Sequence, residues 1–325
     1  MQPLLDVRDL TVGYCSDEGP PSVAVDDLSF DIAVGEAVGL LGESGCGKTT
    51  LGLTLLGLLP TAGRVARGSV IFRETDLLTL RERELQKIRG AGISMVYQEP
   101  GMALNPVIRV GDQIAEVLRA HSPLSLARSR EEAMVLLTQV GFAADSRIDQ
   151  AYPHQLSGGQ KQKVVIAQAI ACHPALIVAD EPTTALDAVT QTEILTLLKT
   201  LQAKLQLALL LISHDPGQLE QVVDRVLVMY AGRLIEEGPT NRVMRRPLHP
   251  YSRGLLQARV SSVPAENHKQ PLRVIPGEPP DLAGLPMGCA FEARCPDGKG
   301  LCRTHKPQDF QPEASRRVAC FNYAH

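Results

Sequence analysis

The sequence contains no tryptophan and few other aromatic residues, and this scarcity limits how its core can be built. Phenylalanine and tyrosine are each present 6 times, so aromatic residues make up only 4% of the chain. We therefore expect a core of leucine, valine, isoleucine and alanine. With 325 residues and an apolar fraction of 44%, the chain is an ordinary globular protein with room for two domains.

A strong excess of one charge and long apolar runs are also missing. The 33 Lys and Arg residues nearly balance 36 Asp and Glu residues, which argues against nucleic acid as a partner. The longest apolar run, residues 205–212, contains Gln206 and is far shorter than the roughly 20 residues that a membrane-spanning helix needs. The first residues do not resemble a signal peptide. We expect a cytoplasmic chain.

The most informative feature that is present is a glycine-rich loop. Residues 42–49 read GESGCGKT and match the pattern G-x-x-x-x-G-K-[ST]. Backbone N–H groups of such a loop wrap a polyphosphate, while Lys48 reaches the outer phosphates and Thr49 binds Mg²⁺. The surrounding sequence predicts a buried strand at 37–41 and a helix at 50–59, ended by Pro60. The predicted nucleotide-binding residues here are Gly42, Ser44, Gly45, Cys46, Gly47, Lys48, Thr49 and Thr50.

Hydrophobic patterning predicts an α/β fold. Alternating apolar residues indicate antiparallel strands before the loop, at 5–12 and 28–32. Continuous apolar runs indicate strands covered on both faces, separated by helical patterns such as residues 191–205. The predicted buried strands are 93–97, 176–179, 207–212 and 226–230. Together these patterns predict a phosphate-loop core with an antiparallel β subdomain, with its chemistry at the carboxyl ends of the parallel strands.

Two further regions differ in composition from this core. Residues 100–168 have helical patterns, at 110–120 and 130–140, and we expect them to form a helical subdomain. After Gly238 the sequence becomes rich in Pro, Arg, His and Gly, which predicts an irregular extension. The predicted domains are residues 1–244 and 245–325.

Polar residues follow several predicted strands. Asp180 and Glu181 close one apolar run, and adjacent residues of a strand point to different sides. We therefore assign Asp180 to Mg²⁺, and Glu181 to the water that attacks the phosphate. An acidic N-cap pair ahead of Pro182 is the simpler alternative.

Two neutral side chains complete this predicted set. Gln98 ends the strand at 93–97, where its amide could contact the metal or its water. His214 ends the strand at 207–212, where a neutral imidazole could donate to the γ-phosphate. Alone, either residue would be read as structural.

A second glycine-rich helix start lies at residues 156–160, LSGGQ. Ser157, Gly158, Gly159 and Gln160 open a helical segment, and helix N-termini bind anions. One chain does not need two such sites for one phosphate group. We therefore expect this element to contact the γ-phosphate of a nucleotide held by a different subunit, in a head-to-tail dimer.

Taken together, these motifs resemble those of ATP-binding-cassette (ABC) ATPases over residues 4–240. The resemblance includes the phosphate loop, Gln98, LSGGQ, the Asp180–Glu181 pair and His214. It implies an Mg²⁺-dependent ATPase that uses ATP as its nucleotide. It also implies roles for Asp187, in the sequence ALD, and for Tyr14, at the position where the family stacks an aromatic ring on adenine.

A narrower resemblance points to the ATPases of oligopeptide, dipeptide and nickel importers. It rests on residues 97–106, YQEPGMALNP, residues 180–187, DEPTTALD, and the extension motifs HPYSRGLL and IPGEPP. It implies a second identical or related ATPase subunit, two transmembrane permease subunits and, indirectly, an extracytoplasmic solute-binding protein. The chain would lie peripherally on the cytoplasmic face of the cell membrane. A soluble ABC ATPase not linked to transport is the alternative, and the choice between peptide and nickel stays open.

A final expectation concerns cysteines in the extension, where little apolar sequence is available for a separate core. Four thiols could order such a segment through a metal site. Their spacing is not the paired C-x-x-C of a zinc ribbon, and resemblance to the family implies a [4Fe-4S] cluster. Zinc and free structural thiols are the alternatives. The four residues are Cys289, Cys295, Cys302 and Cys320.

Overall fold

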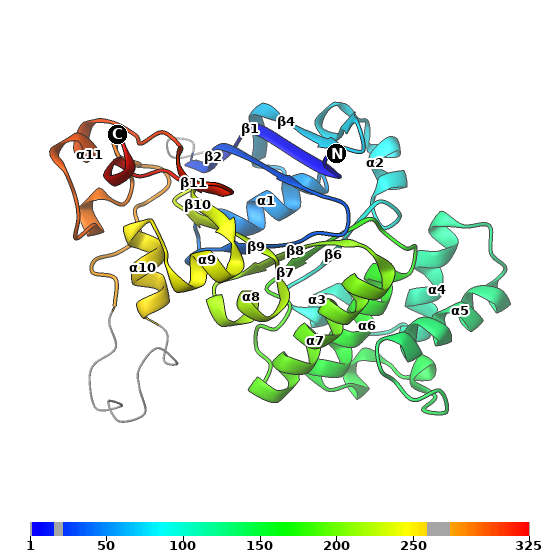
Figure 1. The fold of residues 1–325 in the computed structure, drawn as a ribbon. Helices are drawn as coiled ribbons and strands as arrows, with labels where there is room; N and C mark the ends of the chain where they lie inside the picture. The colour runs from blue at the N-terminus through cyan, green and yellow to red at the C-terminus, as the bar shows by residue number, and fades with distance from the viewer. Residues whose placement is uncertain (1, 16–21, 259–273, 325) are drawn as a thin grey trace, which may run out of the picture. The chain divides into compact units, whose positions relative to one another are not determined.

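The computed structural model describes residues 2–15, 22–258 and 274–324, which form two compact units (Figure 1). Unit 1 comprises residues 1–4, 32–37 and 76–212, and unit 2 comprises residues 5–31, 38–75 and 213–325. Part of the predicted extension, residues 259–273, lies outside the described residues. The predicted domain boundary at residue 244 stays a prediction.

Unit 1 contains three parallel strands in the order β8-β7-β6. They are β6 (Ile93–Val96), β7 (Leu176–Asp180) and β8 (Ala208–Ser213). Every residue of these strands is buried, as expected for parallel strands covered on both faces. Ile177 is paired with Ser94 on one side and Leu209 on the other. The continuous apolar runs therefore predicted these strands correctly.

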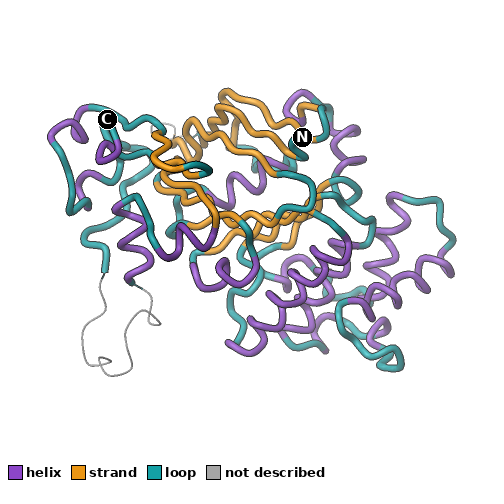
Figure 2. The backbone as a smooth tube through the Cα atoms, in the orientation of Figure 1, coloured by secondary structure: helices purple, strands orange, loops and turns teal. Residues whose placement is uncertain are grey.

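The rest of unit 1 is largely helical. Its α-helices are α2 (Glu82–Ile88), α3 (Pro100–Ala103), α4 (Val110–His121), α5 (Leu126–Gln139), α6 (Gly158–Ile170) and α7 (Ala188–Leu205). The described residues 97–175 are all helix or loop, without a strand (Figure 2). Helix α4 buries Val110, Ile114 and Leu118, which share one helical face. The helical patterns at 110–120 and 130–140 are thus confirmed as helices.

Unit 2 carries an antiparallel sheet built from the N-terminal sequence. Its strands run in the order β2-β1-β4 and are β1 (Leu5–Tyr14), β2 (Ser22–Ile32) and β4 (Gly63–Phe72). Strands β1 and β4 are antiparallel, with Leu5 opposite Phe72 and Tyr14 opposite Gly63. The short strand β5 (Thr75–Asp76) lies where the chain passes into unit 1.

A second set of strands in unit 2 runs in the order β11-β12-β10-β9-β3. These are β3 (Ala37–Leu41), β9 (Arg225–Tyr230), β10 (Arg233–Pro239), β11 (Phe310–Glu313) and β12 (Arg316–Val318). Strand β3 is parallel to β9, whereas β10 is antiparallel to both β9 and β12. The C-terminal extension therefore adds strands to β10, because β12 pairs Val318 with Glu236.

Helix α1 (Lys48–Leu55) follows β3 and is shorter than the predicted 50–59. The prediction used Pro60 as the stop, but Gly57 ends the helix earlier. Gly57 has φ of +62°, and the N–H of Leu58 donates to the carbonyl of Leu53. A glycine in the left-handed region is a common helix terminator.

The remaining helices of unit 2 lie in its C-terminal half. They are α8 (Pro216–Val222), α9 (Thr240–Arg245), α10 (Pro250–Gln257) and α11 (Gly300–Thr304), with 3-10 turns at Glu292–Arg294 and Phe321–Tyr323. In Figure 1 the segment coloured orange to red lies beside β10 and α10. Phe291 of this segment is buried against Tyr230 of β9 and Tyr251 of α10, so the extension packs on the strands of unit 2.

Candidate functional site

The phosphate loop of unit 2 joins β3 to α1, and its second half is held tightly against β2. Gly47 has φ of +106°, and a Cβ atom at this position would lie 2.0 Å from the carbonyl oxygen of Ala24. Only glycine fits both constraints. The carbonyl of Cys46 also accepts from the N–H of Gly232 at 3.0 Å. Fold and sequence thus agree on why this glycine is present.

The start of α1 is suited to binding an anion. Gly47 occupies the N-cap position without a side-chain hydrogen bond to the first turn. Amide N–H groups at a helix start carry a partial positive charge, so they favour a negatively charged ligand. Ser44 and Gly45 of the loop and Thr49 of the helix are exposed.

Lys48 is buried and folds back onto the loop. Its Nζ donates to the carbonyl of Gly42 at 2.8 Å and to that of Glu43 at 2.9 Å. The amine is therefore held against the backbone of the predicted phosphate loop. Cys46 is also buried, and this burial raises the pKa of its thiol.

Tyr14 and Thr50 lie together in unit 2. The hydroxyl of Tyr14 is 3.0 Å from Oγ1 of Thr50, the third residue of α1. This contact places the end of β1 beside the helix that follows the phosphate loop. The assignment of Tyr14 to adenine stays a prediction.

In unit 1, the predicted acidic residues follow β7. Asp180 is the last residue of the strand and is 3% exposed. Glu181 lies beyond the strand with φ of +44°, a left-handed conformation that is uncommon for residues other than glycine. Strand β7 ends at Asp180, so the alternation of strand residues does not extend to Glu181. The roles assigned to Asp180 and Glu181 stay predictions. Strained backbone of this kind is often found at functional sites.

The carboxylate of Glu181 has neighbours from two loops. Its Oε2 accepts from the Gln98 amide at 3.4 Å and from the hydroxyl of Thr184 at 3.0 Å. The structure thus brings together Gln98 and Glu181, which are 83 positions apart in the sequence. Thr184 was not singled out in the sequence, although it lies in the same DEPTTALD segment.

The LSGGQ segment forms the start of α6 and caps part of its own first turn. Oγ of Ser157 accepts from the N–H of Gln160 at 3.3 Å, and Oε1 of Gln160 accepts from the N–H of Ser157 at 2.9 Å. This reciprocal arrangement is a capping box. Gly159 packs against α7, since a Cβ atom there would lie 2.4 Å from Cγ2 of Thr190. The second glycine is therefore required by packing within unit 1.

Asp187 and His214 occupy different settings. Asp187 is the N-cap of α7, and its carboxylate accepts from the Val189 and Thr190 N–H groups at 3.1 and 3.0 Å. Hydrogen bonds from the backbone and hydroxyl of Thr190 lower the pKa of Asp187. His214 is exposed and directly follows β8.

The four cysteines of the extension are near one another without forming a metal site. Burial raises the pKa of Cys289 to about 11, and Cys302, Cys295 and Cys320 contribute to this increase. Among the described residues, however, no group of three or more Cys, His, Asp or Glu side chains could hold a metal ion. The structure therefore gives no support to the predicted [4Fe-4S] cluster, and all four thiols are free.

Comparisons with known proteins agree with this architecture. The sequence profile described as "ABC transporter" matches residues 25–184, and that described as "Oligopeptide/dipeptide transporter, C-terminal region" matches residues 235–302. The chain is 44% identical over 321 residues to the oligopeptide transport ATP-binding protein OppD of Salmonella typhimurium, covering 98% of this chain and 93% of the relative.

The chain belongs to the oligopeptide/dipeptide importer family of ABC transporter ATP-binding subunits. Another similar relative is the dipeptide transport ATP-binding protein DppD of Bacillus subtilis, which is 42% identical over 323 residues and is covered to 95% of its length, with 99% of this chain aligned. Membership makes this subunit an ABC-type ATPase coupled to transport.

A solved structure supports the same fold. The ATP-binding cassette MJ0796, described as dimeric, post-hydrolysis and bound to ADP and Pi, has a TM-score of 0.65 and 28% identity. The match covers 73% of this chain and 98% of the cassette. The mixed α/β fold with an antiparallel β subdomain and a helical subdomain is thus confirmed. In the part of the chain that the structure describes, no helix of this ABC subunit has the length and hydropathy to cross a membrane.

Proposed function

We propose that this subunit hydrolyses ATP to power the import of peptides through separate membrane subunits. It would act with a second ATPase subunit, two transmembrane permease subunits and, indirectly, an extracytoplasmic solute-binding protein. Its place would be the cytoplasmic face of the cell membrane, as a peripheral protein.

The observation that supports this proposal best is the similarity to named peptide-transport ATPases along nearly the whole chain. It includes residues 235–302, which match a C-terminal region described for oligopeptide and dipeptide transporters. A soluble ATPase without a role in transport would have no reason to carry this region. The relatives compared above are named for oligopeptide and dipeptide transport, and neither name mentions nickel.

In unit 2, we assign the phosphates of ATP to the loop at 42–49. The open amides at the start of α1 would bind phosphate oxygens, and Lys48 would exchange its bonds to the loop carbonyls for bonds to phosphate. Tyr14 would stack on adenine, and His214 would donate to the γ-phosphate. Gly42, Ser44, Gly45, Cys46, Gly47, Thr49 and Thr50 complete the set.

In unit 1, we assign the attacking water to Glu181. The water oxygen would form a bond to the γ-phosphorus, its proton would pass to the Glu181 carboxylate, and the bond from phosphorus to the β–γ bridging oxygen would break. ADP would leave with that oxygen. The neighbouring amide of Gln98 would keep the carboxylate oriented.

The other assignments concern Mg²⁺ and the neighbouring subunit. Thr49, Gln98 and Asp180 offer oxygen donors, the ligand type that Mg²⁺ prefers, and the bound ion would neutralise phosphate charge. Ser157, Gly158, Gly159, Gln160 and Asp187 would face a nucleotide held by the second ATPase subunit.

The experiment that tests this function is reconstitution of the full chain with its membrane subunits in vesicles. We expect Glu181→Gln to lower ATP turnover by about a hundredfold to ten-thousandfold and to stop peptide uptake, with unchanged MgATP affinity. Glu193→Gln is the matched control, because Glu193 is exposed on α7 and pairs with Lys163. Near-normal hydrolysis by the Glu181 variant would refute its role, and ATP turnover without uptake of any peptide would refute the transport assignment.

A further inference from the structure

We propose that the C-terminal extension positions the phosphate loop, and that Arg294 and Tyr251 do so by holding Glu43. The inference rests on the proposed role of residues 42–49 as the phosphate cradle. Arg294 lies in a 3-10 turn of the extension, between Cys289 and Cys295, and Tyr251 lies in the first turn of α10. Arg294 and Glu43 are 251 positions apart in the sequence, yet they form an ion pair.

Glu43 is held at three points. Its N–H donates to the Tyr251 hydroxyl oxygen at 2.9 Å, and its carbonyl accepts from Nζ of Lys48 at 2.9 Å. Its carboxylate accepts two bonds from the Arg294 guanidinium, at 2.8 and 3.1 Å. These bonds meet on one residue of the loop. A change in the extension therefore acts on Glu43, whose carbonyl accepts from the Lys48 amine.

Arg294 is itself fixed in a single orientation. Its side chain is 6% exposed, and its Nε donates to the carbonyl of Pro276 at 3.0 Å. The guanidinium lies 5.8 and 5.9 Å from the ring centres of Tyr230 and Phe291. The bonds to Glu43 raise the pKa of Arg294, so the side chain stays charged. The paired, planar geometry of this contact cannot be reproduced by lysine.

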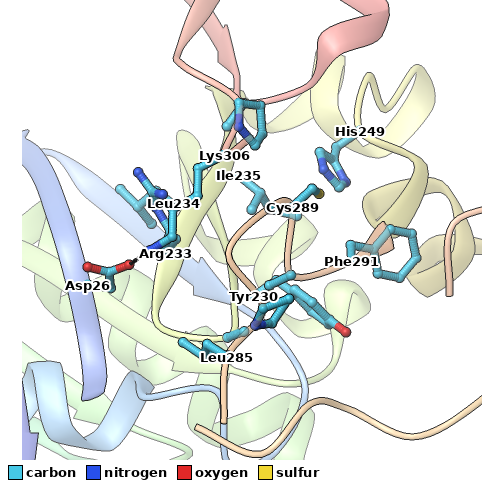
Figure 3. A pocket seen from close by; sticks show the side chains of 16 residues that line it. Asp26, Tyr230, Arg233, Leu234, Ile235, His249, Leu285, Cys289, Phe291 and Lys306 are labelled. Carbon is cyan, nitrogen blue, oxygen red and sulfur yellow. Dashed lines mark hydrogen bonds and ion pairs between the residues drawn. The ribbon is translucent and has the colours of Figure 1, made fainter. Parts of the chain in front are cut away.

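Tyr251 comes from a rigid aromatic cluster. Its ring centre is 4.6 Å from that of Tyr230 and 5.5 Å from that of Phe291, and the residue is fully buried. Burial raises the pKa of Tyr251, so its hydroxyl stays neutral and can accept from the Glu43 N–H. Figure 3 shows Tyr230 and Phe291 in the lining of a pocket that also includes Cys289 and His249.

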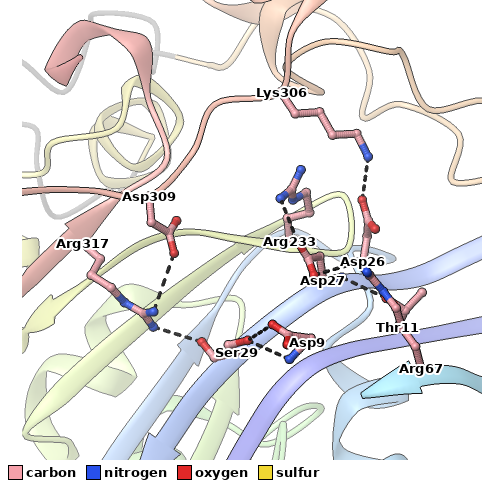
Figure 4. Close-up of polar contacts among 10 residues, drawn as sticks. All are labelled: Asp9, Thr11, Asp26, Asp27, Ser29, Arg67, Arg233, Lys306, Asp309 and Arg317. Atoms are coloured by element: carbon pink, nitrogen blue, oxygen red, sulfur yellow. Dashed lines mark hydrogen bonds and ion pairs between the residues drawn. The ribbon is translucent and has the colours of Figure 1, made fainter. Parts of the chain in front are cut away.

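Ion pairs and a hydrogen bond fasten the extension to the strands of unit 2. Lys306 pairs with Asp26 of β2 at 2.8 Å, and Arg317 donates to the carbonyl of Ser29 at 3.0 Å (Figure 4). Arg316 and Glu236 form a pair that is 1% and 0% exposed. The extension is thus anchored independently of the phosphate loop, so Arg294 and Tyr251 project from a fixed support.

Electrostatics explain why Arg294 would matter for nucleotide binding. Glu43 places a carboxylate in a loop that must receive the negative charges of ATP. An unpaired carboxylate there would repel the phosphates, whereas the paired guanidinium neutralises it. Arg294 is therefore a positioning residue that acts through Glu43, and we expect it to affect nucleotide affinity more than the chemical step.

The test measures MgATP affinity by calorimetry, and KM and kcat for ATP, on the full chain assembled with its membrane subunits. We expect Arg294→Met to weaken affinity and raise KM by about tenfold to a hundredfold, with kcat at saturating ATP nearly unchanged. Adding Glu43→Gln to this variant removes the unpaired charge and should restore the part of the affinity that is lost to repulsion, while the part lost with the hold on the loop should remain. Arg294→Lys should lie between wild type and Arg294→Met.

Arg316→Met is the matched control, since it removes a buried arginine of the same extension that pairs away from the loop. It should lower thermal stability without raising the KM of the folded protein. Wild-type affinity in Arg294→Met, no recovery in the double variant, or an equal KM increase in Arg316→Met would each overturn the inference. If Arg294→Met does not fold, Tyr251→Phe removes only the acceptor for the Glu43 N–H and should weaken affinity about threefold to tenfold; wild-type affinity there would overturn the inference.

Lys48→Ala distinguishes this inference from the proposed role of residues 42–49 as the phosphate cradle, on which it rests. If Lys48→Ala binds MgATP normally, the assignment of the loop as the phosphate cradle fails. If Lys48→Ala loses binding while Arg294→Met does not, only the role of the extension fails.

Discussion

The helix starts at Lys48 and at Gly158 are both rich in glycine, but they leave their first amide groups in different states. Helix α1 has no side-chain cap, whereas Ser157 and Gln160 form a reciprocal capping box on α6. An anion can therefore reach the first turn of α1 directly. At α6 the Ser157 side chain already accepts from the N–H of Gln160, so an anion would meet a first turn that is partly capped.

The glycines of the two segments also differ in purpose. Gly47 is needed for its left-handed backbone and its close approach to Ala24, which shape the loop around a ligand. Gly159 is helical, and it is needed because Thr190 leaves no room for a side chain. A glycine in a motif can thus be required for its backbone conformation or for close packing. Only the first requirement, at Gly47, concerns the ligand. The comparison predicts that α1 governs nucleotide binding and that α6 governs turnover.

The largest predicted effect is on MgATP affinity, from a substitution at the start of α1. Lys48→Ala removes the buried amine that lies against the carbonyls of Gly42 and Glu43. We expect MgATP affinity to fall by about a hundredfold or more, because a charge-assisted bond to phosphate is lost from a desolvated site. Equilibrium binding of a fluorescent ATP analogue to the full chain measures this. Binding within a factor of two of wild type would contradict the assignment.

A smaller effect, on ATP turnover, is expected from a substitution at the start of α6. Ser157→Ala should lower ATP turnover of the assembled transporter by about tenfold, and stability by about 1 kcal/mol through loss of the cap, with nucleotide affinity of the isolated chain unchanged. Ser125→Ala is the matched control, because Ser125 caps α5 through a bond from the Arg128 N–H at 3.2 Å. It should share the stability loss and keep normal turnover. Equal turnover in both variants would remove the distinction between the two helix starts.

The smallest effect near neutral pH concerns a third helix start. Nδ1 of the buried His249 accepts from the Tyr251 N–H at 3.0 Å and so caps α10. Burial, with a contribution from Arg253, lowers the pKa of His249 to about 3. The His249 ring takes up a proton near pH 6.5 in the unfolded chain, but only near pH 3 in the folded chain. The contribution of His249 to the free energy of unfolding is therefore fully present above pH 6.5. It is lost as the pH falls toward 3, by up to about 1.4 kcal/mol per pH unit.

Thermal unfolding as a function of pH measures this contribution. His249→Asn keeps a cap acceptor without a titrating ring, so its stability should fall less steeply than wild type between pH 6.5 and 4. Between pH 7 and 8 the two proteins should show the same pH dependence. Identical slopes below pH 6.5 would show that His249 does not titrate as described.

Much of the parallel core could be predicted because its signals are local. Strands β3, β7 and β8 appear in the sequence as uninterrupted apolar runs, since both of their faces are covered. The phosphate loop was recognised because its glycines, lysine and threonine have fixed spacing. The left-handed turn at Glu181 was missed, since nothing in the residue type indicates it.

The extension was harder to predict because its order depends on distant contacts. The sequence suggested that cysteines would hold it together, whereas the structure packs Phe291 on Tyr230 and Tyr251 and pairs Arg316 with Glu236. Glu43 occupies a variable position of the phosphate motif, so the motif gives no reason to look for its partner. In the sequence, Arg294 is marked only by its position between Cys289 and Cys295, and this position does not indicate Glu43 as its partner.

The most direct measurement is a structure of the assembled transporter carrying Glu181→Gln, with ATP and Mg²⁺ bound. The account predicts phosphate oxygens at the amides of residues 44–49, with Nζ of Lys48 moved from the carbonyls of Gly42 and Glu43 onto the phosphates. Phosphates bound elsewhere, with Lys48 still donating to those two carbonyls, would contradict it.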